Sequence, residues 1–253
     1  MKKKIALFIF TISISTAIFG QQLEISARGS YKSTWLFNKN ISDLGDKQDY
    51  AAGWGYNYGL SACIYFNSKI GIEVDGLLNM HAGNYAGTLD SQRTYTSNVK
   101  MNSIEIPLLF KLKSSTGAYL EIGPQLGMIN SAHYQFLQSY YNSSTGANVN
   151  NNSSYFVDSN YATTNISAVL GFGINIKLVS HLSLKTGIRF EYGLTDLKGV
   201  DALGQNLANT VLYPTKYATN SAAGGLFLAL TWRFGKDDEG GSSPPPPPPP
   251  PGN

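Results

Sequence analysis

Few side chains in this 253-residue sequence are of types suited to catalysis. A hydrolase or an acyltransferase would need a histidine beside a nucleophile or a carboxylate. The histidines are His81, His133 and His181, and only His133 with Ser131, or His81 with Asp90, offers such a pair. Chance proximity in polar loops explains these pairs better than catalysis does, so we predict that the protein is not an enzyme.

Metal, cofactor and nucleotide sites are not expected either. His81 and His133 lack the spaced third ligand of a zinc site, and the single cysteine, Cys63, excludes a disulfide framework or a cysteine-based metal cluster. The Gly-Phe-Gly sequence at 171–173 lies within a predicted strand instead of at a strand-to-helix turn, so it is no phosphate cradle. We expect Cys63 to be a buried filler and not a reactive thiol.

The first residues have the layout of a secretory signal peptide. Three lysines at 2–4 precede the apolar run 5–19, which is too short to span a bilayer. We assign residues 1–20 to this signal, with cleavage after Ala17 or Gly20. Its removal takes 3 of the 19 lysines and arginines and none of the 16 acids, which leaves 16 charges of each sign. A neutral mature chain without a basic, aromatic-rich run gives no reason to expect a nucleic-acid partner.

Eight stretches of the remaining chain alternate apolar and polar residues with a period of two, as strands do. They span residues 23–35, 54–66, 69–80, 103–112, 118–128, 165–178, 182–195 and 222–234. Most are roughly 11 to 14 residues long, which exceeds typical soluble strands and suffices to cross a bilayer at a tilt.

The connections alternate between short turns and long loops. The turns at 67–69, 115–117 and 179–181 have an odd length, which keeps facing residues on one side of a hairpin. The loops cover roughly 38–53, 81–98, 132–163 and 196–220. We therefore predict an all-β fold, an eight-stranded antiparallel up-and-down transmembrane β-barrel over residues 21–235 in the outer membrane, with its long loops outside the cell.

The predicted turns fix the register of the strands. They pair Phe66 with Ile70, Ser114 with Ala118, Leu178 with Leu182, Lys111 with Glu121, Pro107 with Gln125 and Cys63 with Glu73. Pro107 has no N–H for its neighbour, and we expect the amide of Gln125 or a water to bind the carbonyl that is left unpaired.

The polar face of these strands carries charges of both signs. They are Glu24, Glu73, Asp75, Glu105, Glu121 and Glu191 against Arg28, Lys32, Lys111, Lys177, Lys185, Arg189 and Arg233. An eight-stranded barrel is just wide enough for side chains to fill its interior. A balanced set of charges there predicts an ion-paired plug with a structural role, not the lining of a channel.

Aromatic residues gather near both ends of the apolar face. Trp35, Trp54, Tyr56 and Tyr192 lie toward the loops, and Phe66, Phe110, Trp232 and Phe234 toward the turns. Such rings are typical of the two membrane–water interfaces, so we predict two membrane girdles.

Several segments together resemble the PorT-type outer-membrane β-barrel domain family. They are IEIPLLFKLK at 104–113, YLEIGPQLG at 119–127, GFGINIKL at 171–178, FEYGLTDL at 190–197 and the final LTWRF. The resemblance implies an eight-stranded outer-membrane barrel without enzyme activity, and some relatives serve a secretion and gliding apparatus. The chain departs from the usual pattern because 19 residues follow the aromatic Phe234.

These residues include eight consecutive prolines at 244–251. They predict a polyproline II rod of about 25 Å, which would extend into the periplasm as part of a tail over residues 236–253. A stiff disordered terminus is the simpler interpretation, and a docking site for a proline-reading partner is the alternative.

The predicted function is a structural or interaction role through the extracellular loops, and an accessory role in a secretion apparatus is one form that it could take. The alternatives are a small lipid-modifying enzyme and a narrow pore. We expect a monomer whose partners are outer-membrane lipid and the barrel-insertion machinery, with a secretion complex as a further candidate partner. The sequence NSSTGANVNNNSS in the loop 132–163 is polar and low in complexity, and we expect it to be mobile and not folded.

Overall fold

The computed structural model describes residues 22–90, 93–142, 144–204 and 213–234. The predicted signal peptide and the predicted proline-rich tail lie outside this part of the chain.

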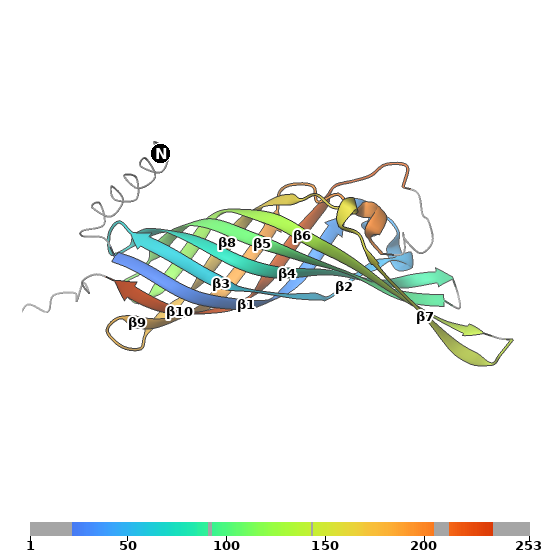
Figure 1. The fold of residues 1–253 in the computed structure, drawn as a ribbon, viewed down its shortest axis with the longest axis horizontal. Helices are drawn as coiled ribbons and strands as arrows, with labels where there is room; N and C mark the ends of the chain where they lie inside the picture. The colour runs from blue at the N-terminus through green and yellow to red at the C-terminus, as the bar shows by residue number, and fades with distance from the viewer. Residues whose placement is uncertain (1–21, 91–92, 143, 205–212, 235–253) are drawn as a thin grey trace, which may run out of the picture.

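Eight long antiparallel strands form a closed ring (Figure 1). Each of these strands pairs with the ring strands before and after it in the chain, including β4 with β5. The pairing of β1 with β10 closes the barrel. The strands are β1 (Gln22–Asn38), β3 (Gly53–Tyr65), β4 (Ile70–Asp90), β5 (Arg93–Lys113), β6 (Ala118–Asn142), β8 (Thr164–Lys177), β9 (Leu182–Gly193) and β10 (Thr219–Phe234). The predicted all-β, eight-stranded architecture is confirmed.

The smaller elements all lie at the loop end of the barrel. They are the strands β2 (Asp49–Ala51) and β7 (Ala147–Phe156), the helix α2 (Lys39–Ser42) and the 3-10 turns η1 (Gly45–Lys47), η2 (Asp158–Asn160) and η3 (Val200–Ala202). β2 pairs with β4, and β7 with β6. No helix in the described ranges is long and apolar enough to cross a membrane.

The predicted hairpin registers are confirmed. Backbone hydrogen bonds join Phe66 to Ile70, Ser114 to Ala118 and Leu178 to Leu182. Lys111 lies opposite Glu121, Pro107 opposite Gln125 and Cys63 opposite Glu73. Gly117 ends its turn with φ at 89°, a left-handed conformation that glycine adopts without strain.

The prediction for Pro107 was wrong about the neighbouring strand. The backbone N–H of Lys113 donates to the carbonyl of Lys69 on the β4 side, and such bonds recur at every second residue of an antiparallel pair. The nitrogen of Pro107 therefore faces Asp75 on β4, where the ladder is interrupted between Val74 and Leu77. Gln125 lies on the other side, so its amide does not replace the missing bond.

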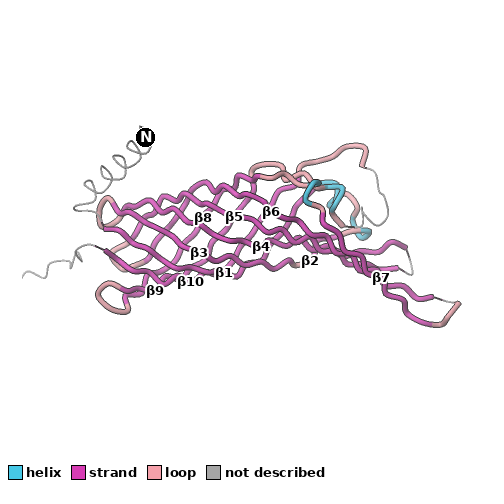
Figure 2. Tube along the Cα trace, viewed as in Figure 1, coloured by secondary structure: helices cyan, strands magenta, loops and turns pink. Residues whose placement is uncertain are grey.

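Three strands are extended most beyond their predicted ends. β4 and β5 have 21 residues each and β6 has 25, and their upper parts occupy most of the predicted loops 81–98 and 132–163. With β2 and β7 they form a sheet that projects beyond the ring, which we call the projection (residues 82–90, 93–101, 131–142 and 147–156, with 49–51; Figure 2). Residues 147–154 of the asparagine-rich segment expected to be mobile lie in β7, which pairs with β6 over its whole length.

The barrel and the projection have opposite polarity. Along the lower part of β5, the inward residues Glu105 and Lys111 are buried while the outward Ile106 and Phe110 are exposed. Between residue 102 and the loop end of β5, apolar residues such as the fully buried Val99 take the inward positions. The outward face therefore suits lipid around the ring, and water around the projection.

Candidate functional site

The lumen of the barrel contains a continuous network of ion pairs centred on Arg189. The guanidinium of Arg189 lies 2.8 Å from Asp75 Oδ2 and 2.6 Å from Glu121 Oε1. Arg28 shares Asp75 at 2.7 Å, and the ammonium of Lys111 lies 3.3 Å from Glu121 Oε2. This network links β1, β4, β5, β6 and β9 across the interior, so it holds opposite walls of the barrel together.

The same network continues toward the turn end. Glu73 accepts from Lys111 and lies 3.4 Å from Arg28, and it is 3.7 Å from Lys185. Lys185 lies 2.7 Å from Glu24, which Arg233 also contacts at 3.1 Å. Every carboxylate in this network is thus shared by at least two cations.

A separate triad lies toward the loop end. Lys32 Nζ lies 2.6 Å from Glu191 Oε2 and 3.6 Å from Glu105 Oε2. All three side chains are more than nine-tenths buried. The triad holds two carboxylates and one ammonium, so its carboxylates are less fully compensated than those near the turn end.

Twelve of the thirteen charges predicted to face the lumen belong to these two groups of ion pairs. The thirteenth, Lys177, has an exposed side chain at the turn end of β8. A strand's last residues point past the end of the barrel, so sharing the polar face does not bury Lys177.

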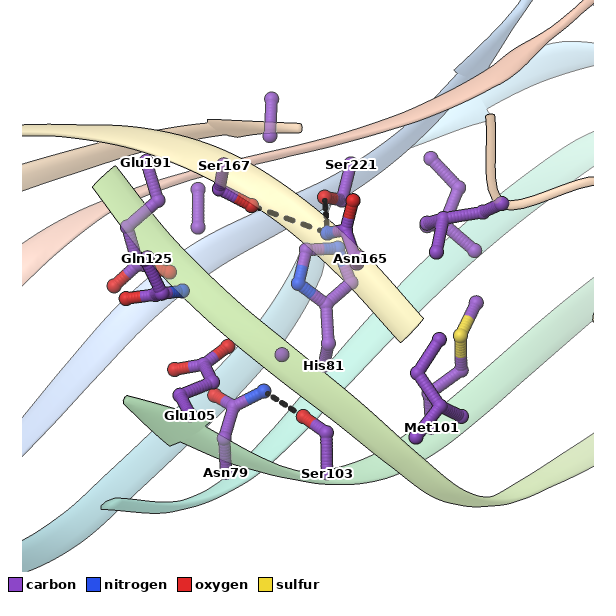
Figure 3. A pocket seen from close by; sticks show the side chains of 16 residues that line it. Asn79, His81, Met101, Ser103, Glu105, Gln125, Asn165, Ser167, Glu191 and Ser221 are labelled. Carbon is purple, nitrogen blue, oxygen red and sulfur yellow. Dashed lines mark hydrogen bonds between the residues drawn. The ribbon is translucent and has the colours of Figure 1, made fainter. Parts of the chain in front are cut away.

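A small cavity separates the triad from the upper part of the barrel (Figure 3). Glu105, Gln125 and Glu191 lie at one end of it, and His81 extends into its middle. Its volume is about 30 Å³, and a cavity needs roughly 10–15 Å³ to hold one water. Gln125 Oε1 has no hydrogen-bond partner among the described residues. The cavity is therefore polar and of a size for about two waters, not for an organic ligand.

The side chains predicted to be unreactive are held inside the barrel. Cys63 is 1% exposed. His81 donates from Nε2 to the carbonyl of Trp35 over 3.0 Å. Asp90 lies nine residues further along β4 at the tip of the projection, where it pairs with Arg93 at 2.6 Å, so His81 and Asp90 do not meet.

His133 has a hydroxyl partner that the sequence did not indicate. Its Nε2 lies 2.9 Å from Ser154 Oγ on β7, while Ser131 instead accepts from Asn102. Phe156 packs edge-on against the imidazole, with ring centroids 5.1 Å apart. The pair lies on an exposed sheet face, and no carboxylate hydrogen bond orients His133 among the described residues. We interpret it as a cross-strand contact.

An apolar core fills the inside of the projection and covers the loop end of the lumen. The strands contribute Tyr85, Tyr95, Val99, Met101, Ala132, Tyr134 and Phe136, and the segments between strands contribute Ile41, Val157, Tyr161, Leu197, Ala202 and Leu203. We call this core, together with Leu36 from β1, the cap. Sequence reasoning missed it, although the alternation of Tyr95, Val99 and Met101 within 93–101 was a usable signal.

Tyrosine hydroxyls tie the segments of the cap to the strands. Tyr85 donates to the carbonyl of Leu36 over 2.9 Å, and Tyr161 to that of Ala202 over 3.3 Å. Tyr134 donates to the carbonyl of Gly204. Burial raises the pKa of Tyr85 and of Tyr161 well above the usual value for a phenol. These side chains therefore stay protonated donors throughout the physiological range.

The aromatic residues predicted to form girdles lie on the outer surface near the two ends of the ring. Trp54, Tyr56 and Tyr192 are about half exposed, and Trp35 is partly covered by Phe37, with stacked rings 6.1 Å apart. Phe66, Phe110, Trp232 and Phe234 are similarly exposed toward the turns. Tyr31, which was not predicted, stacks on Trp54 at 5.3 Å and adds to the band near the loops.

No three His, Cys, Asp or Glu side chains converge on a metal-binding geometry anywhere in the part of the chain that the structure describes.

Residues 19–199, which make up more than half of the chain, match the family described as the outer membrane protein beta-barrel domain. The chain belongs to this family. It is therefore an outer-membrane β-barrel protein, and the apolar outer surface of the ring is the surface that faces lipid. No curated protein matches the chain.

Several solved outer-membrane barrels are similar to this family member. Ail, the attachment invasion locus protein of Yersinia pestis, crystallised in complex with the heparin analogue sucrose octasulfate, is 12% identical with a TM-score of 0.35, over 84% of this chain and 99% of Ail. Neisserial surface protein A is 13% identical with a TM-score of 0.38, over 84% and 97% of the two chains. OprG from Pseudomonas aeruginosa is 11% identical with a TM-score of 0.34, over 85% and 96%. Similarity at this level says nothing about what this chain binds.

Proposed function

We propose that the protein acts at the cell surface as a non-enzymatic interaction protein, with the projection as its binding surface. The observation that carries the proposal is the cap, because it makes the projection a folded extension of the barrel instead of a set of loose loops. Rigid presentation lowers the ordering cost of binding. The short turns and the segment after β10 then face the periplasm.

The outward face of the projection supports contact with a partner that is not strongly charged. Residues 134–157 contain no charged residue. Phe156, which packs against His133, is 78% exposed, and Tyr155 on the other face of β7 is 51% exposed. Exposed aromatic side chains supply much of the binding energy at protein interfaces, so we infer that the β6–β7 hairpin is the part that contacts the partner.

Site-specific photocrosslinking in intact cells tests this proposal. A photoreactive phenylalanine analogue in place of Phe156 should give a crosslinked product of higher mass. The matched control is the same analogue at Val179, which is exposed in a turn at the opposite end. Identical products from both positions, or none from Phe156, would refute the proposal. A component of a secretion apparatus in the Phe156 product would identify the protein as an accessory of that machine.

The lumen network supports a barrel that does not conduct. Ion-paired side chains occupy the interior at several levels between the turns and the cap. We expect no stepwise current from the purified protein in planar bilayers, and steady open-channel conductance would overturn this part of the proposal.

A further inference from the structure

A second cavity opens at the turn end of the lumen, away from the projection. It lies between the turn 115–117 and the turn 178–181, and the end of β10 forms its third side. The backbone N–H of Asn175 donates to the carbonyl of Gly117 over 2.9 Å, and the backbone N–H of Arg233 donates to the carbonyl of His181 over 2.8 Å. These bonds fix the walls of the cavity, whose volume is about 280 Å³. It is therefore large enough to receive side chains or a small ligand.

The lining of this turn-end cavity is cationic. Lys113, Lys177 and Arg233 line it, and none of its described lining residues is acidic. The carboxylate of Glu24 contacts Arg233 and is shared with Lys185. Among the described lining residues of this cavity, positive charges therefore outnumber negative ones.

Lys113 is the most distinctive residue of the turn-end cavity. It is half buried, and no carboxylate lies within 4.0 Å of its ammonium among the residues that the structure describes. Its ammonium instead lies over the ring of Tyr65, 5.5 Å from the centroid. Partial burial of a cation without a counterion is unfavourable, so a negatively charged group at this position would be stabilising.

A buried hydroxyl points to the same ligand chemistry. Ser183 lines the turn-end cavity and is 5% exposed, and its Oγ has no hydrogen-bond partner among the described residues. A serine hydroxyl can donate to a carboxylate, and hydrogen bonds to a charged acceptor are stronger than neutral ones. Lys113 and Ser183 together therefore form a site suited to a carboxylate.

The chain itself supplies carboxylates at this end of the barrel. Three consecutive acids, Asp237, Asp238 and Glu239, follow β10, which ends at Phe234 beside the cavity. Three to five residues of extended chain span roughly 10–18 Å, which is enough to reach across the mouth of so narrow a barrel. We propose that the acidic segment 237–239 docks in the turn-end cavity against Lys113 and Ser183. Docking would fix the point from which the prolines at 244–251 leave the barrel.

Distance measurements between two spin labels test the docking in the folded, full-length mature chain. In a Cys63→Ala background, one nitroxide is placed at Ser68→Cys in the turn 67–69, and the other at Gly240→Cys. The parent should give a narrow distance distribution. The distribution should broaden in the triple variant Asp237→Asn, Asp238→Asn, Glu239→Gln and in the single variant Lys113→Gln. It should also broaden for the parent in 1 M salt, where the Debye length falls to about 3 Å.

Lys69→Gln is the matched control, because it removes an exposed lysine from a turn outside the cavity lining. It should leave the distribution narrow. A broad distribution in the parent, or a narrow one that survives both charge changes, would overturn the proposal. Binding of inorganic phosphate that depends on Lys113 while the parent distribution stays broad would also overturn it, because the site would then belong to a free anion. Unaltered heat-modifiable migration in gels confirms that each variant is folded.

Discussion

Replacement of Lys32 by methionine should destabilise the barrel strongly. Lys32 is the cation within 4 Å of both Glu105 and Glu191 in the described structure, and all three are buried. Removing one partner of a buried pair costs about 3–5 kcal/mol, because the other charge stays buried without compensation. The contact at 2.6 Å dominates over that at 3.6 Å, since Coulomb energy falls with distance. We therefore expect one such cost and not two.

Urea titration of the barrel in lipid vesicles measures this cost, with heat-modifiable gel migration as the folding readout. At an m-value of about 2 kcal/mol/M, a loss of about 4 kcal/mol lowers the midpoint by roughly 2 M. The triple variant Lys32→Met, Glu105→Gln, Glu191→Gln removes all three charges and should regain most of the loss. A single variant within 1 kcal/mol (about half a molar in midpoint) of the parent, or a triple variant as unstable as the single one, would refute the reasoning.

Two single variants within the same triad sharpen the test. Glu105→Gln leaves the shorter Lys32–Glu191 pair intact and removes the second carboxylate from a site with one ammonium. Glu191→Gln removes the shorter pair. We expect Glu105→Gln to cost less free energy of unfolding than Glu191→Gln, and the reverse order would contradict the assignment of the dominant pair.

Three further predictions follow from the placement of the membrane and of the cap. Leu228→Arg, at an outward position near the middle of β10, should lower the free energy of unfolding in vesicles by about 2–4 kcal/mol. Leu137→Arg on the projection should lower it by under about 1 kcal/mol. Equal losses would mean that the membrane is misplaced. Cys63 should resist maleimide in the folded barrel while Ser68→Cys reacts within the same time, and fast labelling of Cys63 would contradict its burial. Val99→Asp buries a charge in the cap and should expose residues 132–163 to limited proteolysis, while the barrel stays heat-modifiable. Unchanged proteolysis would show that the cap does not hold the projection.

The ring could be predicted well because each of its features depends on local pattern. A period of two identifies strands, and an odd turn such as 115–117 fixes the register through hydrogen bonding alone. Once Lys111 was placed opposite Glu121, both had to share one face. The pairing of individual charges could not be predicted, because Arg189 contacts Asp75 and Glu121 on strands that are not its sequence neighbours.

The projection was missed for a related reason. Its strands continue those of the ring, but their apolar residues change from the outward to the inward face near residue 102. A search for apolar residues on one constant face ends a strand at this point. Likewise, the polar β7 has little apolar alternation of its own and is ordered by pairing with β6.

The number of ring strands, the turn registers, the two faces of each strand and the balance of charge in the lumen can all be derived from the order of residues along the chain. Which carboxylate meets which cation, where the barrel ends and the projection begins, and how loop residues such as Ile41 and Leu203 close the lumen depend on the folded molecule. Alternation along a strand shows only which side chains share a face. Whether that face meets lipid, water or other side chains depends on the neighbouring strands and on the height in the membrane.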